Sequence, residues 1–158
     1  MQVFEQRRGQ YMISTDPARL DVDAIHAFLA HESYWASGIA RDVLERAIDH
    51  SLCFGLYDGA AQIGFARVIS DYATYAYLND VYVLAPQRGQ GLARWLLESV
   101  VAHPDLKGLA RIMLTTKDAQ PFYERFGFMQ LVFPVRHMER LAAEFLARMR
   151  AGAEPPAS

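Results

Sequence analysis

Two glycines, Gly89 and Gly91, separate an alternating apolar run from an apolar run with helical spacing. The first turn of a helix leaves backbone N–H groups unpaired, and the helix dipole places roughly half a positive charge at the same end. Glycines at this point remove side chains that would keep a ligand away from the backbone, and Arg88 and Arg94 add positive charge. The pattern predicts a site for an anionic group such as a phosphate or pyrophosphate.

The residues after the glycines narrow the choice of phosphate ligand. A P-loop needs a Lys-Ser/Thr pair after its second glycine, and Leu92 and Ala93 stand there instead. A dinucleotide fingerprint needs a third glycine, and Arg94 occupies that position. A strand-to-helix turn that simply requires glycine is the alternative.

A second block, "DAQPFYERFGF" over Asp118–Phe128, strengthens the ligand interpretation. Together with Arg88–Ala93 it resembles the two cofactor motifs of the GNAT acyltransferase superfamily, R/Q-x-x-G-x-G/A and N-x-x-A-x-x-F/L-Y-x-x-x-G-F. The resemblance runs from about Tyr11 to Phe133, and both motifs occur in the family's order.

The resemblance implies that the protein uses acetyl-CoA. The pantetheine arm would lie beside the strand that contains Val81 and Val83, and Tyr123 would be the general acid for the departing thiolate. Asp118 replaces the family's frequent Asn, so it can accept a hydrogen bond but cannot donate as an amide does. The pyrophosphate would lie on the backbone of Arg88, Gly89, Gln90, Gly91, Leu92 and Ala93.

Acyl transfer to an amine also requires a group that takes a proton. Asp80, an acid in the mostly apolar run "YLNDVYV", is the best candidate for the base, directly or through water. Strand alternation places it on the same face as Leu78 and Tyr82. A satisfied structural carboxylate is the alternative role, and Asp71 is a rival base that is also typical of a turn.

The acceptor side is expected between the first two helices, where Tyr34 and Trp35 would form a binding wall or pack over the sheet. Arg67 could meet an acidic group of the acceptor or an acid such as Asp71. Cys53 lies in an apolar run and is expected to pack as a small hydrophobe. The five histidines lack metal-ligand spacing, so no metal site is expected.

Sequence patterns predict an α/β fold, with a mixed, mostly antiparallel sheet flanked by helices and a V-shaped splay between the two central strands. The strands are predicted over 11–16, on both sides of Asp58-Gly59, and over 74–84, 109–116 and 128–135. The helices are predicted over 20–33, 40–51, 91–103, 118–127 and 138–152.

The 158 residues predict an N-terminal arm (1–10), one domain with a C-terminal helix (11–150) and a disordered tail (151–158). The net charge of −2 argues against a nucleic-acid partner, and no apolar run is long enough to span a membrane. A lone cysteine favours the cytoplasm. The C-terminal helix docks on its own domain or forms a homodimer.

These expectations combine into an acetyl-CoA-dependent N-acetyltransferase that acts on a primary amine of a small molecule by direct transfer in a ternary complex. A peptide or protein amine is the second acceptor class. A non-catalytic CoA-binding regulatory module is the alternative from a different class.

Overall fold

The computed structural model describes residues 2–143 and 146–147. One sheet contains six strands in sequence order, in which neighbours are antiparallel except for the parallel pair β5–β6. The strands are β1 (Glu5–Arg8), β2 (Tyr11–Ser14), β3 (Leu52–Asp58), β4 (Ala61–Ser70), β5 (Tyr75–Val83) and β6 (Arg111–Met113). The predicted mixed, mostly antiparallel α/β fold is confirmed.

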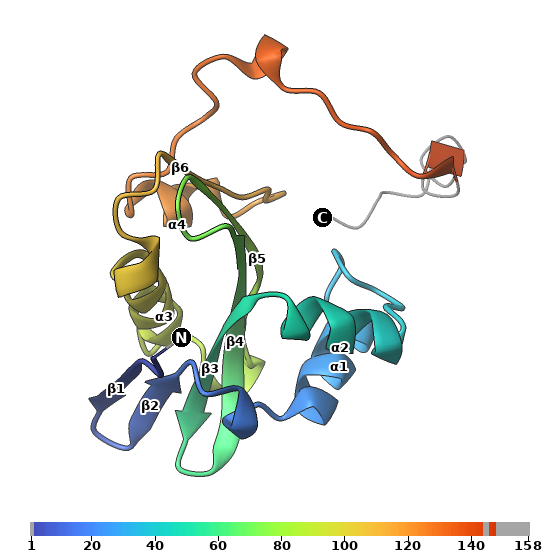
Figure 1. Cartoon of the computed structure of the whole chain (residues 1–158). Helices are drawn as coiled ribbons and strands as arrows, with labels where there is room; N and C mark the ends of the chain where they lie inside the picture. Colours follow the sequence, from blue (N-terminus) through green and yellow to red (C-terminus); the bar gives the residue numbers. More distant parts are fainter. Residues whose placement is uncertain (1, 144–145, 148–158) are drawn as a thin grey trace.

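Helices cover both faces of the sheet (Figure 1). The helices are α1 (Val22–His31), α2 (Arg41–Asp49), α3 (Leu92–Val101) and α4 (Gln120–Glu124). Helices α1 and α2 pack on one face around Phe65 and Tyr82, whereas α3 packs on the other around Phe54 and Val68. The site described below lies at the end of the sheet where these two layers meet β5 and β6.

Local sequence explains where the first helices begin and which faces they bury. The Asp21 carboxylate accepts the Ala24 amide at 2.9 Å, which satisfies one unpaired donor of the first turn of α1. In α2, Leu44 and Ile48 face the sheet as the helical period predicts. Val43 is 47% exposed, because it lies outside this apolar stripe.

The N-terminal residues form a strand that the sequence did not indicate. The expected arm over residues 1–10 is wrong for Glu5–Arg8, which pairs with β2 through a turn at Gly9. Glycine suits this turn because its φ is 58°. The strand is polar and mostly exposed, so its sequence lacks the apolar alternation that marks a half-buried strand.

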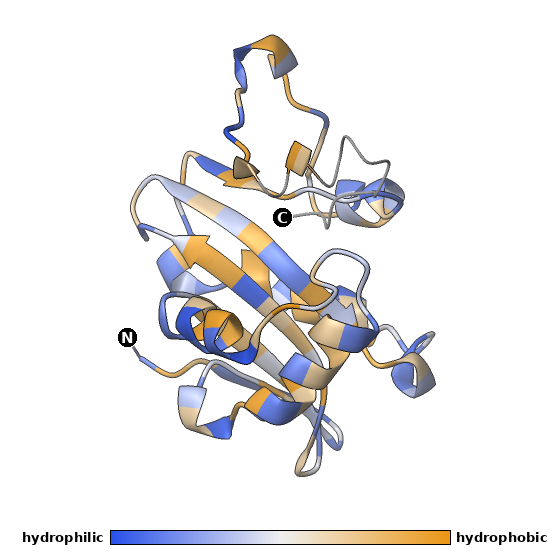
Figure 2. Cartoon of the chain, turned by 90° about the vertical axis from the view of Figure 1, so that its right-hand side faces the viewer, coloured by the Kyte–Doolittle hydropathy of each residue, from blue (hydrophilic) through white to orange (hydrophobic). Residues whose placement is uncertain are grey.

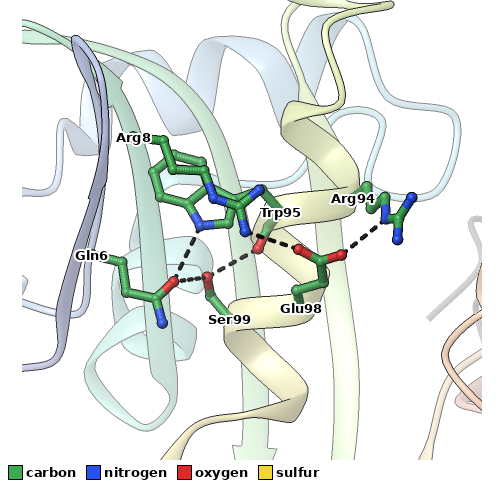
Figure 3. A network of polar contacts seen from close by, with 6 residues as sticks. All are labelled: Gln6, Arg8, Arg94, Trp95, Glu98 and Ser99. Carbon is green, nitrogen blue, oxygen red and sulfur yellow. Dashed lines mark hydrogen bonds and ion pairs between the residues drawn. The ribbon is translucent and has the colours of Figure 1, made fainter.

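Side chains from α3 hold β1 in place (Figure 3). The Gln6 Oε1 atom accepts hydrogen bonds from Trp95 Nε1 at 3.1 Å and from Ser99 Oγ at 3.0 Å. The Arg8 guanidinium lies 4.9 Å from the centre of the Trp95 ring and pairs with Glu98 at 3.1 Å. These long-range contacts tie the first strand to the helix that follows the glycine pair.

The chain after α4 differs from its prediction in the opposite way. The strand expected over 128–135 does not form, and a 3-10 turn (Pro134–Arg136) overlaps its end. Of the helix expected over 138–152, residues 138–142 are not helical, whereas residues 143 and 146–147 are. Part of that helix, including Phe145 and Met149, and the expected tail over 151–158 lie outside the described residues.

A β-bulge interrupts β5. Between the paired positions Arg67–Asn79 and Phe65–Tyr82, β5 has one residue more than β4. Asp80 lies in this bulge with a φ of 53°, a left-handed conformation that Asp tolerates better than most residues.

The bulge changes which β5 side chains share a face. Leu78 packs on the α3 side, whereas Tyr82 packs on the α1–α2 side. The expectation that Asp80 shares a face with both is therefore wrong for Leu78, because the extra residue reverses the alternation.

The splay has the expected partners. Strand β6 pairs with β5 only from Tyr75 to Tyr77, and β5 then continues to Val83 without it. Because β6 is the last strand in the described sheet, the splay lies near one edge rather than between two central strands.

Candidate active site

The glycine pair forms an open turn at the start of α3. Gly89 and Gly91 have φ values of 79° and 76°, which favour glycine. A Cβ atom at either position would meet no other atom within 4 Å, so these positions open on free space. Gly91 provides no side-chain cap, and the first intrahelical bond runs from Trp95 N to Gly91 O. The amides of residues 92–94 precede that bond, so the turn fits a pyrophosphate.

Neighbouring side chains fix this turn. The Tyr11 hydroxyl donates to Gln90 Oε1 at 2.9 Å, which ties the turn to β2. Arg88 Nε donates to the Val83 carbonyl at 3.0 Å, so this side chain braces the end of β5. Arg94 pairs with a side chain of its own helix, Glu98, at 2.9 Å. The turn is therefore held from its strand, its helix and the N-terminal hairpin.

A cavity of about 120 Å³ lies at the mouth of the splay. It brings together predicted residues that are far apart in the sequence, namely Tyr34, Trp35, Asp80, Val81, Asp118 and Tyr123. Arg67 and Val83 do not line it. Six further lining residues were not predicted as site residues: Leu78, Asn79, Leu114, Thr115, Thr116 and Ala119. The two threonines could have been located from their position just after β6, the strand that diverges from β5.

Asp80 is a buried, paired carboxylate. Its Oδ2 accepts from Arg67 Nε at 2.6 Å, and its Oδ1 accepts from Trp35 Nε1 at 3.1 Å. Arg67 is itself buried and also donates to Ser51 Oγ at 3.2 Å. Thus Arg67 pairs with Asp80 and not with Asp71. One donor on each carboxylate oxygen leaves a lone pair on each for a further donor.

Asp71 lies in an exposed turn between β4 and β5. Its carboxylate accepts from the Thr74 hydroxyl and from the amides of Ala73, Thr74 and Tyr75. The Thr74 hydroxyl and these amides hold the pKa of Asp71 well below its usual range. Asp71 does not line the cavity, so its position fits the turn interpretation rather than that of a base.

Tyr123 points its ring into a small aromatic cluster beside the cavity. Its centroid lies 5.2 Å from that of Phe122 and 5.8 Å from that of Phe128, both edge-on. Burial raises the pKa of Tyr123 to about 12, and the nearby Tyr34 adds to the shift. The phenol therefore keeps its proton at neutral pH, as a general acid must.

Tyr34 and Trp35 form the outer wall of the cavity. Tyr34 is 45% exposed, and its hydroxyl accepts the Lys117 amide at 3.4 Å. The Trp35 ring packs against Phe28 at 6.4 Å while its N–H is held by Asp80. Two roles were expected for these aromatics, a binding wall or packing over the sheet. Trp35 packs partly over the sheet, whereas Tyr34 faces outward.

Cys53 is buried on the α1–α2 side. Its Sγ lies 3.9 Å from the Ile48 carbonyl, and burial raises the pKa of this thiol to about 12. A thiol that stays protonated is a poor nucleophile, which confirms the packing interpretation. Among residues 2–143 and 146–147, no group of His, Cys, Asp and Glu side chains could hold a metal ion. No helix within these residues is long and apolar enough to cross a bilayer.

Comparisons with known proteins agree with this geometry. The family model of the acetyltransferase (GNAT) domain matches residues 49–130. A crystal structure from Xanthomonas campestris pv. campestris, assigned to the GNAT family, superposes with a TM-score of 0.82 at 49% identity, covering 84% of this chain and 93% of that one.

Two further relatives are similar in sequence. A Gibberella zeae protein named as an acetyltransferase is 39% identical over 133 residues, 70% of this chain and 74% of that protein. The chloroplastic serotonin N-acetyltransferase 2 of Oryza sativa subsp. japonica is 33% identical over 118 residues, 69% of this chain and 56% of that protein. The glycine turn, the splay and these similarities lead to one conclusion: the chain belongs to the GNAT acetyltransferase family.

Proposed function

We propose that this protein transfers the acetyl group of acetyl-CoA to a primary amine of a small molecule, directly and within a ternary complex. The observation that carries the proposal is the cavity of about 120 Å³, which joins an acid, aromatic walls and Tyr123 at the mouth of the splay. A cavity this small suits a compact amine better than a polypeptide chain. We further propose that the reaction takes place in the cytoplasm.

Backbone groups would hold the cosubstrate. The pyrophosphate would lie on the backbone of residues 88–93, where Gly89 and Gly91 open on free space. The Arg88 amide already donates to the Ala85 carbonyl, so the amides of residues 89–93 would bind the phosphate oxygens. The pantetheine arm would follow Val81 and Val83, where β5 continues without β6. Asp118 lies at the exposed rim of the cavity, where its carboxylate can accept a hydrogen bond from the cosubstrate.

The chemistry needs three proton transfers. The neutral amine forms the new C–N bond at the thioester carbonyl as the C–S bond breaks, and Tyr123 gives its proton to the departing thiolate. The nitrogen then releases its extra proton, directly or through water, and this proton restores Tyr123. Asp80 binds the incoming ammonium through its remaining lone pairs and takes a proton from it, directly or through water. Arg67 stabilises the charge of Asp80 and would act on the acceptor through it.

We propose arylalkylamines as the first acceptors to examine. Three aromatic side chains, Tyr34, Trp35 and Tyr123, line the cavity together with Asp80. An aromatic ring with a cationic amine matches such a lining. The rice relative named serotonin N-acetyltransferase 2 supports the same class.

Calorimetry with coenzyme A comes first in the test, followed by thioester consumption with arylalkylamines, polyamines, amino acids and short peptides. We expect CoA binding and the largest kcat/KM with an arylalkylamine. A preference for peptides would contradict the acceptor class. CoA binding without turnover on any amine would favour the regulatory module, and the absence of CoA binding would overturn the proposal as a whole.

A further inference from the structure

The chain contains two lysines among its 16 lysine and arginine residues, and one of them stands at the candidate active site. Lys117 lies between Thr116 and Asp118, and both of these neighbours line the cavity at the mouth of the splay. Lys117 itself is exposed. A primary amine, the chemical group that the proposed reaction acetylates, is thus built into the rim of the cavity.

The Lys117 side chain lies over the aromatic wall of this cavity. Tyr34 comes from the loop between α1 and α2, on the side of the molecule that faces the viewer in Figure 2. Its hydroxyl accepts the Lys117 amide at 3.4 Å, and the Lys117 ammonium lies 5.9 Å from the centre of its ring. Because aromatic rings attract cations, Lys117 places its amine where the lining also attracts the ammonium of an acceptor.

We propose that the enzyme acetylates Lys117 of its own molecule, so that this side chain is an internal acceptor and a modification site. The inference rests on the proposed acetyl transfer from acetyl-CoA to an amine, and it extends that reaction to an amine of the chain itself.

The distance that the amine has to cover is short. Tyr34 and the proposed general acid Tyr123 line the same cavity of about 120 Å³, so its outer wall and its acid lie close together. Lysine carries its ammonium on a flexible four-carbon stem, and exposed side chains exchange rotamers within nanoseconds. Rotation about the side-chain bonds of Lys117 therefore moves its amine from the Tyr34 ring toward the thioester without a change of fold.

The transfer balances in the same way as transfer to a free amine. The Lys117 ammonium first gives a proton to water. The lone pair of the neutral Nζ then forms a C–N bond at the thioester carbonyl, and the C–S bond breaks with its electron pair on sulfur. Tyr123 protonates this thiolate, and the nitrogen releases its extra proton, which restores Tyr123. The products are an acetamide on Lys117 and coenzyme A.

The second lysine provides a reference within the same molecule. Lys107 is exposed and follows the 3-10 turn Pro104–Leu106, and it does not line the cavity. Spontaneous acetylation by the thioester would reach both lysines, whereas transfer at the active site reaches Lys117 alone. The other basic residues are arginines, whose guanidinium groups stay charged and do not compete as acceptors.

The test incubates the purified full chain with acetyl-CoA at neutral pH and follows each lysine by peptide mass spectrometry. We expect an acetyl group on Lys117, formed about tenfold faster or more than on Lys107, because the active site holds the reacting groups together. Since donor site and acceptor belong to one molecule, the rate constant should not depend on protein concentration. Tyr123→Phe should slow the modification by about the same factor as it slows turnover of a free amine.

Matched substitutions separate the two lysines. Lys117→Arg keeps a cation beside Tyr34 but removes the acceptor amine, so this variant should gain no acetyl group at that position. Lys107→Arg should be modified at Lys117 at the wild-type rate. The same preparations are assayed in parallel for thioester consumption with the panel of free amines described above.

Three outcomes would overturn the proposal. They are turnover of a free amine with Lys117 unmodified, equal rates at Lys107 and Lys117, and a rate constant that rises with protein concentration, which would mean transfer between molecules. The first of these leaves the proposed function intact. The absence of both free-amine turnover and modification of Lys117 would overturn the two proposals together.

Discussion

The two edges of the sheet are stabilised in opposite ways. At the β1 edge a polar strand is held by hydrogen bonds and an ion pair to α3. At the β6 edge a three-residue strand adjoins a groove, and an apolar segment leaves the domain. From polarity alone, the apolar residues 128–135 would be expected to form an edge strand, and the polar residues 5–8 would not. The comparison teaches that partners distant in the sequence, rather than local pattern, decide whether an edge strand forms.

The difference also divides stability from chemistry. The β1 edge braces the glycine turn through Tyr11 and α3, whereas the cavity and Tyr123 adjoin β6. We therefore expect substitutions near β6 to act mainly on turnover, and substitutions near β1 and the glycine turn on stability and cosubstrate binding. Asp80 should affect both, because it lines the cavity and belongs to a buried ion pair.

The largest effect is expected for Tyr123→Phe. Loss of the general acid should lower kcat by about 10²–10⁴-fold. The phenyl ring keeps the aromatic contacts with Phe122 and Phe128, so the thermal midpoint should change little. Because the pKa of Tyr123 is about 12, wild-type kcat should show no loss from its ionisation between neutral pH and pH ~10. Near-normal turnover in the variant would show that Tyr123 is not the general acid.

Asp80→Asn should cost the most stability, about 3–5 kcal/mol, because it leaves the buried Arg67 cation without its counter-charge. Asparagine keeps the shape of the side chain and tolerates the left-handed backbone at this position. Urea unfolding measures the change, and Arg67→Gln/Asp80→Asn should cost less than the two single changes together. A loss below about 1 kcal/mol would mean that water already screens the pair.

Gly91→Ala should separate backbone strain from ligand binding. Alanine at a φ of 76° costs about 1–2 kcal/mol, and its methyl group would occupy the open space of the turn. Gly59→Ala is the matched control, since Gly59 has a φ of 58° in the β3–β4 turn and equally free surroundings. Both variants should lose similar stability, but only Gly91→Ala should raise the KM for acetyl-CoA, by about tenfold. Equal KM values for acetyl-CoA in the two variants would mean that the pyrophosphate binds elsewhere.

The smallest effect concerns His103 at the β1 edge. From the sequence, the charged ring was expected to favour the helix dipole at the end of α3, but the structure buries it against the rings of Phe4 and Phe54. Burial lowers the pKa of His103, so the folded state prefers the neutral ring. Its contribution to stability is complete above the ordinary pKa of about 6.5 and declines as the pH falls below it. His103→Asn keeps an acceptor for the Asp105 amide and should flatten that part of the urea-stability profile. An unchanged slope would assign the pH dependence to other groups.

Features with local causes were predictable from the sequence. The glycine turn, the Asp21 cap and the Asp58-Gly59 hairpin each depend on a few adjacent residues, and the structure contains all three. The glycine turn of the candidate site belongs to this class, because its open geometry depends on its own backbone.

Features made by distant residues could not be predicted in the same way. Asp80 reaches Arg67 across a bulge and Trp35 across 45 positions, and neither contact has a local signature. The bulge also reverses the alternation from which the face of Asp80 was inferred. The β1 strand was missed for a similar reason, since its partners on α3 are about 90 residues away.

The burial of Cys53 has a practical consequence. It is the sole thiol of the chain, and a pKa of about 12 keeps it unreactive toward alkylating reagents at neutral pH. A cysteine introduced at an exposed position such as Val135 would then carry a spin label or fluorophore alone, without removal of the native residue. The wild-type chain is thus already a suitable background for site-specific labelling.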